Sequence, residues 1–136
     1  TRGGVCRYHL MVQLEKRSEG EAKNVILAAF GAHYDIKHVV VVDPDVDIHD
    51  DNDVQWAVAT RFQASRDLVI VEGAQSSKLD PSTDAGVGAK MGLDATIPLA
   101  AEPFTFTRIR VPGEDEIDPA ALAAKEPARL VAELLD

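Results

Sequence analysis

One glycine-rich stretch combines the residue types that approach phosphate groups. It runs Gly86-x-Gly88-x-Lys90-x-Gly92. Glycine allows a backbone to come close to a phosphate, and lysine adds a positive point charge. The stretch is not a Walker motif, because the glycine spacing differs and no Lys-Ser or Lys-Thr pair follows. From these residues alone, phosphate binding and a tight turn entering a strand are equally good interpretations.

A second group of residues with chemical potential is a run of aspartates that follows an apolar stretch. The run holds six of them: Asp43, Asp45, Asp47, Asp50, Asp51 and Asp53. Its first three match the opening of an EF-hand calcium loop, but Ile48 stands where that loop needs glycine, and Val54 where it needs a bidentate glutamate. We therefore prefer a solvated loop whose last acids favour the positive end of the next helix.

The remaining reactive side chains show no catalytic pattern. No metal-ligand spacing connects the four histidines, His9, His33, His38 and His49, which we expect to be structural or exposed. Ser76 and Ser77 lack the Gly-x-Ser-x-Gly pattern of a nucleophile elbow. The single cysteine, Cys6, lies in a strand-like run and is interpreted as a buried thiol. A lone cysteine fits a reducing compartment, so we predict a cytoplasmic protein.

Composition limits the partners and the number of domains. The chain has 136 residues, 46% apolar and 27% charged, with a net charge of -9. This predicts one α/β domain over residues 1–136, and it argues against a nucleic-acid footprint or a cationic membrane face. We find no apolar run of membrane-spanning length and no signal-peptide pattern. The first residue is not methionine, so we expect a segment of a longer protein, or else N-terminal processing.

The element that positions these residues is the stretch 37–43, which contains four consecutive valines, Val39 to Val42. Such a run predicts a strand buried on both faces, as in a parallel sheet with helices on each side. A strand over 5–16 and a helix ending near Ala32 precede it, and Ser18 with Glu21 forms a capping-box pattern. The order strand, helix, strand favours a right-handed crossover and a parallel pair.

Further elements follow in the second half. We predict a helix over 53–63 with Asn52 and Gln55 as its capping pattern, a strand over 67–72, a long functional or mobile loop over 73–89, and an exposed strand over 104–111. Residues 112–136 read as an acidic linker and a C-terminal helix whose apolar stripe docks on a partner. The predicted fold is a three-layer α/β/α sandwich with a mostly parallel or mixed central sheet.

Several ordered segments together resemble the carboxy-terminal domain of the UbiD family of decarboxylases. They are Glu19-Gly-Glu-Ala-Lys23, His38-Val-Val-Val-Val-Asp-Pro-Asp-Val-Asp-Ile48, Asp53-Val-Gln-Trp-Ala-Val-Ala-Thr-Arg61 and Gly88-Ala-Lys-Met-Gly-Leu-Asp-Ala-Thr96. The resemblance covers most of residues 4–100 and leaves the segment after residue 103 without family signal. It implies a reversible, non-oxidative carboxy-lyase of aromatic or α,β-unsaturated acids. The implied cofactors are prenylated FMN, a divalent metal, commonly manganese, and potassium.

The resemblance also implies that the reacting groups lie elsewhere. The family's catalytic Glu-Arg-Glu set and metal ligands belong to a preceding flavin-binding domain, so no catalytic or metal-binding residue is assigned here. Lys90 aligns with the lysine of the family's Gly-x-Lys-Met-Gly motif and is the one candidate cofactor-binding residue, near the flavin phosphate. We expect no cofactor on this segment alone.

The working hypothesis is a carboxy-terminal domain that is inactive by itself, caps an active site and contributes to a homo-oligomer. Its expected partner is the flavin-binding domain of the same protein or of a neighbouring subunit. The alternative is a stand-alone binding or assembly module, or a regulatory subunit, without catalysis of its own.

Overall fold

The computed structural model describes residues 7–102, 104–109, 112–113 and 118. Backbone contacts divide the chain into two units, Thr1–Phe106 and Thr107–Asp136. The described helices and strands all belong to the first unit: β1 (His9–Gln13), α1 (Glu21–Ala32), β2 (His38–Val42), α2 (Asp51–Arg61), α3 (Ala64–Asp67), β3 (Leu68–Gln75) and β4 (Val87–Ala95). None of these helices is long and apolar enough to cross a lipid bilayer.

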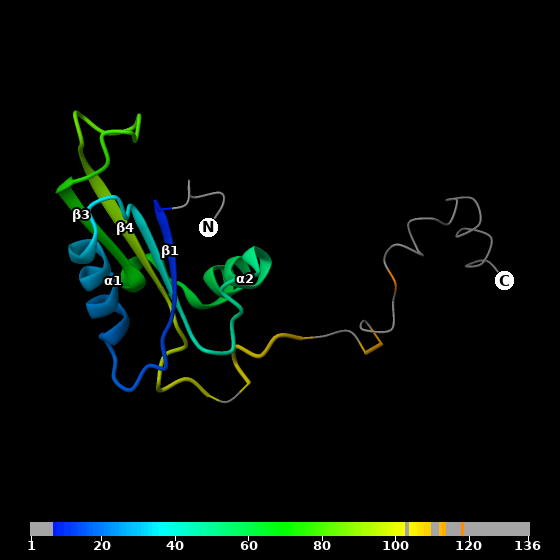
Figure 1. Cartoon of the computed structure of the whole chain (residues 1–136). Helices are drawn as coiled ribbons and strands as arrows, with labels where there is room; N and C mark the ends of the chain where they lie inside the picture. The colour runs from blue at the N-terminus through cyan, green and yellow to red at the C-terminus, as the bar shows by residue number, and fades with distance from the viewer. Residues whose placement is uncertain (1–6, 103, 110–111, 114–117, 119–136) are drawn as a thin grey trace. The chain divides into compact units, whose positions relative to one another are not determined.

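The sheet is mixed and has the strand order β1-β2-β4-β3. The β1–β2 and β2–β4 pairs are parallel, whereas β3 is antiparallel to β4 at the edge. Helices α1 and α2 lie on opposite sides of this sheet (Figure 1). The predicted α/β sandwich and the parallel first pair of strands are therefore confirmed.

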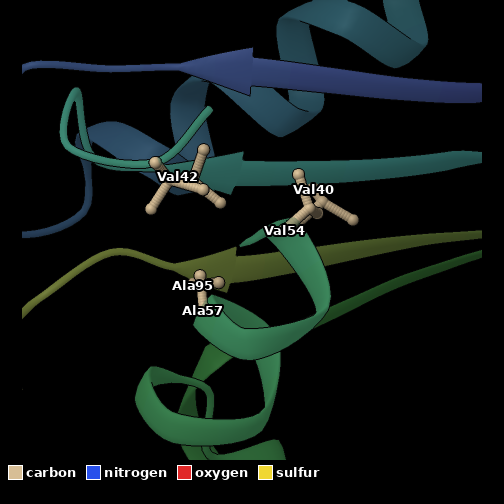
Figure 2. Close-up of a cluster of buried hydrophobic side chains, with 6 residues drawn as sticks. Val40, Val42, Val54, Ala57 and Ala95 are labelled. Atoms are coloured by element: carbon tan, nitrogen blue, oxygen red, sulfur yellow. The ribbon is translucent and has the colours of Figure 1, made fainter. Parts of the chain in front are cut away.

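Strand β2 is buried on both faces because its side chains alternate between two cores. Val39 and Val41 pack in the core that α1 covers, while Val40 and Val42 pack in the core that α2 covers. Figure 2 shows Val40 and Val42 facing the α2 residues Val54 and Ala57. The exposed fraction of the four valines does not exceed 8%. Four consecutive β-branched residues thus specify a strand with a helix on each side.

The helix starts differ from their predicted capping patterns. Helix α1 begins after Gly20, whose φ of 90° is left-handed, and no side chain caps it. The Glu21 carboxylate accepts a hydrogen bond from the Arg17 backbone N–H at 2.6 Å and also interacts with Ser18, but Gly20 and not Ser18 is the N-cap residue. Helix α2 begins two residues earlier than predicted, because the Asp50 side chain accepts from the Asn52 N–H at 2.9 Å. Aspartate is as good an N-cap as asparagine, so the earlier acid takes the role.

The glycine-rich stretch forms strand β4, and its glycines have different functions. Gly86 has a φ of +87° in the turn that enters the strand. Gly92 lies directly under α1, where an added Cβ would come 2.2 Å from Cγ2 of Ile26. The Gly92 position therefore permits the close approach of helix and sheet. Of the two interpretations of this stretch, the tight turn entering a strand describes its backbone.

The predicted strand over 104–111 is wrong for residues 104–109, the part of it that the structure describes. Residues 104–106 form a turn, and 107–109 have no regular structure. Phe104 and Ile109 are 86% and 94% exposed, so the alternating pattern has no core to face. A strand also needs a neighbouring strand to bond its backbone. The predicted C-terminal helix and Cys6 lie outside the described residues, and the division of residues 112–136 into linker and docking helix stays a prediction.

We predict that Gly92→Ala destabilises the chain by about 1–3 kcal/mol, because the new methyl group overpacks the contact with Ile26. The free energy of unfolding from urea denaturation measures this. Gly31→Ala is the matched control, since no atom lies within 4 Å of its added Cβ on α1. The control should stabilise by about 0.5–1 kcal/mol, as alanine does in a helix. Equal effects of the two substitutions would contradict the packing role of Gly92.

Candidate functional site

The carboxyl edge of the parallel strands is the first candidate site. The chain leaves β1 toward α1 on one face and leaves β2 toward α2 on the other. Adjacent parallel strands whose connections diverge in this way open a crevice at their carboxyl ends, where open α/β sheets bind ligands. The aspartate run begins at this point, directly after Val42.

A buried arginine organises the aspartate run. The side chain of Arg61, at the end of α2, is 0% exposed. It makes a two-pronged pair with the Asp45 carboxylate, at 3.0 Å from Nη1 and 2.7 Å from Nη2. Nη1 also donates to Oδ2 of Asp43 at 2.9 Å. The guanidinium carbon lies 5.1 Å from the Trp56 ring centroid, in cation–π range. Two acids therefore neutralise one desolvated cation.

The pKa values of the two aspartates that contact Arg61 shift in opposite directions. Burial raises the pKa of Asp43. The hydrogen bonds that Asp43 accepts from Ile97 and Arg61 lower this pKa, but by less than burial raises it. The hydrogen bonds from Arg61 lower the pKa of the more exposed Asp45. Burial by itself would lower the pKa of Arg61, but Asp45 and Asp43 outweigh it and raise that pKa. Asp45 is therefore the firmer ionic partner, whereas Asp43 carries the desolvation cost.

Asp43 and two further acids hold the segment that follows β4. Oδ2 of Asp43 accepts a hydrogen bond from the Ile97 backbone N–H at 2.7 Å. Glu19, in the loop after β1, accepts from the Leu99 N–H at 2.6 Å. Asp94 accepts from the Thr96 hydroxyl at 2.6 Å and completes the turn. Carboxylates from both preceding loops thus fix an apolar segment, Ile97–Pro98–Leu99, at the carboxyl edge.

Lys90, the sequence-predicted cofactor residue, lies on the α1 face of β4 and is 3% exposed. Its ammonium donates to the backbone carbonyls of Tyr34 and Ile36 at 2.7 and 2.6 Å. Burial lowers the pKa of Lys90, and the charge of Asp35 opposes that shift. The structure therefore gives Lys90 a task that the sequence did not indicate, which is to hold the loop between α1 and β2. Its predicted contact with a flavin phosphate stays a prediction.

The loop predicted over residues 73–89 is shorter in the structure, where it comprises residues 76–86 between β3 and β4. It lies at the amino edge of the parallel strands, opposite the carboxyl edge, and hydrogen bonds and an ion pair hold it in place. Asp80 pairs with Lys37 at 2.7 Å and accepts from the Ser82 hydroxyl at 2.8 Å. These bonds lower the pKa of Asp80 to about 2. The Ser76 N–H donates to the Gly86 carbonyl at 2.8 Å and closes the loop. The loop borders a cavity of about 570 Å³.

Among the described residues, no group of three or more histidine, cysteine or acidic side chains could hold a metal ion. The aspartates that come together do so around Arg61. His9 and His38 instead meet edge to face, with ring centroids 4.6 Å apart. These described residues therefore do not fit the divalent metal that the family resemblance implies, and no chemical step is assigned to a metal here.

Sequence reasoning missed Arg61 and predicted a solvated aspartate loop. One signal could have identified it: Val54, Ala57 and Arg61 share one face of α2, so the arginine falls on the apolar stripe. A cation on a buried stripe requires an anionic partner. The excess of aspartates just before α2 supplies that partner. The pattern thus predicts a buried ion pair when both features are read together.

Comparison with known proteins identifies a family and relatives that this chain resembles. The family model described as 3-octaprenyl-4-hydroxybenzoate carboxy-lyase C-terminal domain (UbiD_C) matches residues 1–95. Anhydromevalonate phosphate decarboxylase from Methanocaldococcus jannaschii is 51% identical over 114 residues, which are 82% of this chain and 27% of that protein. The chain thus spans about a quarter of the length of this relative.

Two solved structures of one enzyme are also similar. The UbiD-class enzyme HmfF from Pelotomaculum thermopropionicum, in complex with FMN, is 54% identical with a TM-score of 0.78, over 89% of this chain and 27% of that chain. An evolved dimeric form of HmfF, in complex with prFMN, is 46% identical with a TM-score of 0.63, over 89% of this chain and 24% of that chain.

We predict that Arg61→Leu destabilises the chain by about 3 kcal/mol, because it leaves the partly buried Asp43 carboxylate without its cation. Leucine keeps much of the buried volume, so the loss reports on the charge. Arg66→Leu is the matched control, since Arg66 is 57% exposed and pairs only with its neighbour Asp67 among the described residues. The control should cost less than about 1 kcal/mol. Urea denaturation measures both, and equal losses would contradict the role of Arg61.

Proposed function

This chain belongs to the UbiD family, and on that premise we propose that it is the carboxy-terminal domain of a prenylated-FMN-dependent, non-oxidative decarboxylase. The proposed substrate is an aromatic or α,β-unsaturated carboxylic acid. The observation that carries the proposal is the family match over residues 1–95. The relative from Methanocaldococcus jannaschii, a decarboxylase by name, supports the reaction class. The HmfF structures, which hold FMN or prFMN, support a flavin cofactor.

We further propose a division of labour between this chain and a preceding flavin-binding domain. That domain would supply the catalytic residues and the sites for manganese and potassium, since the described residues of this chain offer no metal-ligand cluster. When bound, prenylated FMN supplies the electron sink for decarboxylation. This chain would cap the active-site cleft and contribute contacts in a homo-oligomer. A protein that caps a site acts by orienting the substrate and excluding water.

The carboxyl edge is the surface that we assign to this capping task. The segment Ile97–Pro98–Leu99 is apolar, and Leu99 is 52% exposed. Hydrogen bonds from Ile97 and Leu99 to two carboxylates keep the segment in one position. A rigid apolar wall suits the body of an unsaturated or aromatic acid, and it keeps water out of the cleft. Arg61 acts through Asp43 and is therefore a positioning residue.

We predict that Ile97→Ala lowers kcat/KM of the full-length enzyme by about tenfold, because it removes apolar wall contact worth about 1–3 kcal/mol. Decarboxylation by the protein reconstituted with prenylated FMN measures this with a panel of unsaturated and aromatic acids. Ile109→Ala is the matched control, since Ile109 is 94% exposed, and it should keep full activity. Decarboxylation by the 136-residue chain alone, with cofactor supplied, would contradict the division of labour.

Lys90 carries a separate proposal, a contact with the flavin phosphate. Two of its three ammonium protons go to the carbonyls of Tyr34 and Ile36, which leaves one donor. We predict that Lys90→Met in the full-length protein weakens flavin affinity about tenfold, measured by flavin fluorescence titration. Lys23→Met, at an exposed position of α1, is the control. Unchanged affinity with a lowered melting temperature would leave Lys90 with its loop-holding role only.

A further inference from the structure

Three side chains that carry metal-donor atoms lie in one row across the sheet. His9 of β1 is paired with His38 of β2, and His38 is paired in turn with Met91 of β4. Neighbouring strands lie about 4.8 Å apart, and residues paired directly across parallel strands project from the same face of the sheet. The fold thus brings two imidazoles and one thioether together from three separate parts of the sequence. We call these three residues the donor row.

The donor row lies on the face of the sheet that α2 partly covers. The residues two positions further along each strand all belong to the core under α2, and they are Met11, Val40 and Leu93. Because side chains alternate between the two faces of a strand, the donor row projects from this same face. Met91 is 36% exposed, and its neighbour Ile70 on β3 is 57% exposed, so this end of the face is open to solvent.

The two imidazoles are already at a distance that suits one shared metal ion. Their ring centroids are 4.6 Å apart, and their planes meet at 74°. A metal bound to one nitrogen of each ring at about 2 Å lies roughly 3 Å from each centroid, so the observed separation corresponds to an angle of roughly 100° at the metal. This is close to a tetrahedral angle. The broad χ2 torsion of histidine lets each ring turn a nitrogen toward the shared point.

The environment of the rings also favours metal binding. Burial lowers the pKa of His9 and of His38. A lowered pKa favours the neutral imidazole, which is the form that binds metal ions. Each neutral ring needs only one of its two nitrogens for the metal and keeps the other for a hydrogen bond.

The type of donor atom selects a soft, monovalent ion. Thioether sulfur is a soft ligand that favours Cu(I), whereas magnesium, calcium and manganese favour carboxylate and carbonyl oxygens. The donor row contains no acid, and the described part of the chain has no cluster of three histidine, cysteine or acidic side chains for a harder ion. Two imidazoles and a thioether are neutral, so they do not compensate the charge of the ion. A single positive charge is easier to hold in such a site than two.

A metal in the donor row would add a link that the sheet lacks. Strand β1 is an edge strand whose hydrogen-bonded neighbour in the described sheet is β2, and it does not pair with β4. An ion shared by His9 and Met91 would join β1 to β4. Because the three ligands come together only in the folded chain, binding of the ion stabilises that state. The melting temperature should therefore rise with the concentration of the ion.

We propose that His9, His38 and Met91 form a binding site for one Cu(I) ion. The two imidazoles supply nitrogen ligands, and the Met91 thioether supplies the third. The ion ties the strands β1, β2 and β4 together, and no electron transfer or other chemical step is assigned to it. The inference rests on the register of these strands and does not require the proposed function.

Anaerobic titration of the 136-residue chain with Cu(I), in competition with the chromophoric chelator bicinchoninate, tests the site. The thiol of Cys6, the single cysteine, would compete for Cu(I), so every protein in the test carries Cys6→Ser. We expect one ion per chain, a higher melting temperature with Cu(I), and at least tenfold weaker binding in His38→Gln. His49→Gln is the matched control, because His49 is exposed in the loop before α2, and it should keep full affinity.

A second variant, Met91→Leu, separates metal binding from packing. Leucine keeps most of the volume of methionine, so the fold should persist while the affinity for Cu(I) falls about tenfold. X-ray absorption at the copper edge gives an independent measurement. We expect a sulfur ligand in the protein with Met91 and its loss in Met91→Leu.

Three outcomes would overturn the proposal. Equal Cu(I) affinity in His38→Gln and His49→Gln would remove the imidazole ligands. A copper absorption spectrum without sulfur in the protein that retains Met91 would remove the thioether. Tighter binding of Zn(II) than of Cu(I), with the same dependence on His38, would define a site for a divalent ion instead.

Discussion

The fold depends on one constraint, the burial of β2 on both faces. Four valines in a row leave no polar side of the strand to face water, so each face needs its own cover. Helix α1 covers one face and α2 covers the other. The chain must then leave β1 and β2 in opposite directions, and this divergence opens a crevice at the carboxyl edge. The location of the candidate site is thus a consequence of how a single apolar run is covered.

The aspartate run illustrates how desolvation is managed at that crevice. Burying the Arg61 guanidinium removes its hydration, which a single exposed acid would not replace. Asp45 provides the two-pronged bond and Asp43 a second contact, while Asp43 also accepts from the Ile97 backbone. One ion network therefore ties α2, the loop after β2 and the segment after β4 together. An acidic composition that looks like a solvated surface in the sequence is partly structural.

Sequence reasoning succeeded where one local pattern determined one element. The valine run and the strand–helix–strand order predicted β1, α1 and β2 in that order along the chain. It failed where the outcome depended on a partner distant in sequence. Within the part of the chain that the structure describes, residues 104–109 have no neighbouring strand. Arg61 contacts acids 16 and 18 residues earlier, and Lys90 donates to carbonyls more than 50 residues away. Of these pairings, only that of Arg61 leaves a signal in the sequence, and the signal is visible only when the apolar face of α2 and the preceding aspartates are considered together.

Strand β4 connects the two ends of the domain physically. At its start, the turn at Gly86 contributes to the amino-edge cavity, and at its end Asp94 and Thr96 begin the segment of the carboxyl edge. Between them, Lys90 holds the loop beside Asp35 and Gly92 fits under α1. A strand held at both ends and packed tightly in the middle cannot shift at one end without strain at the other.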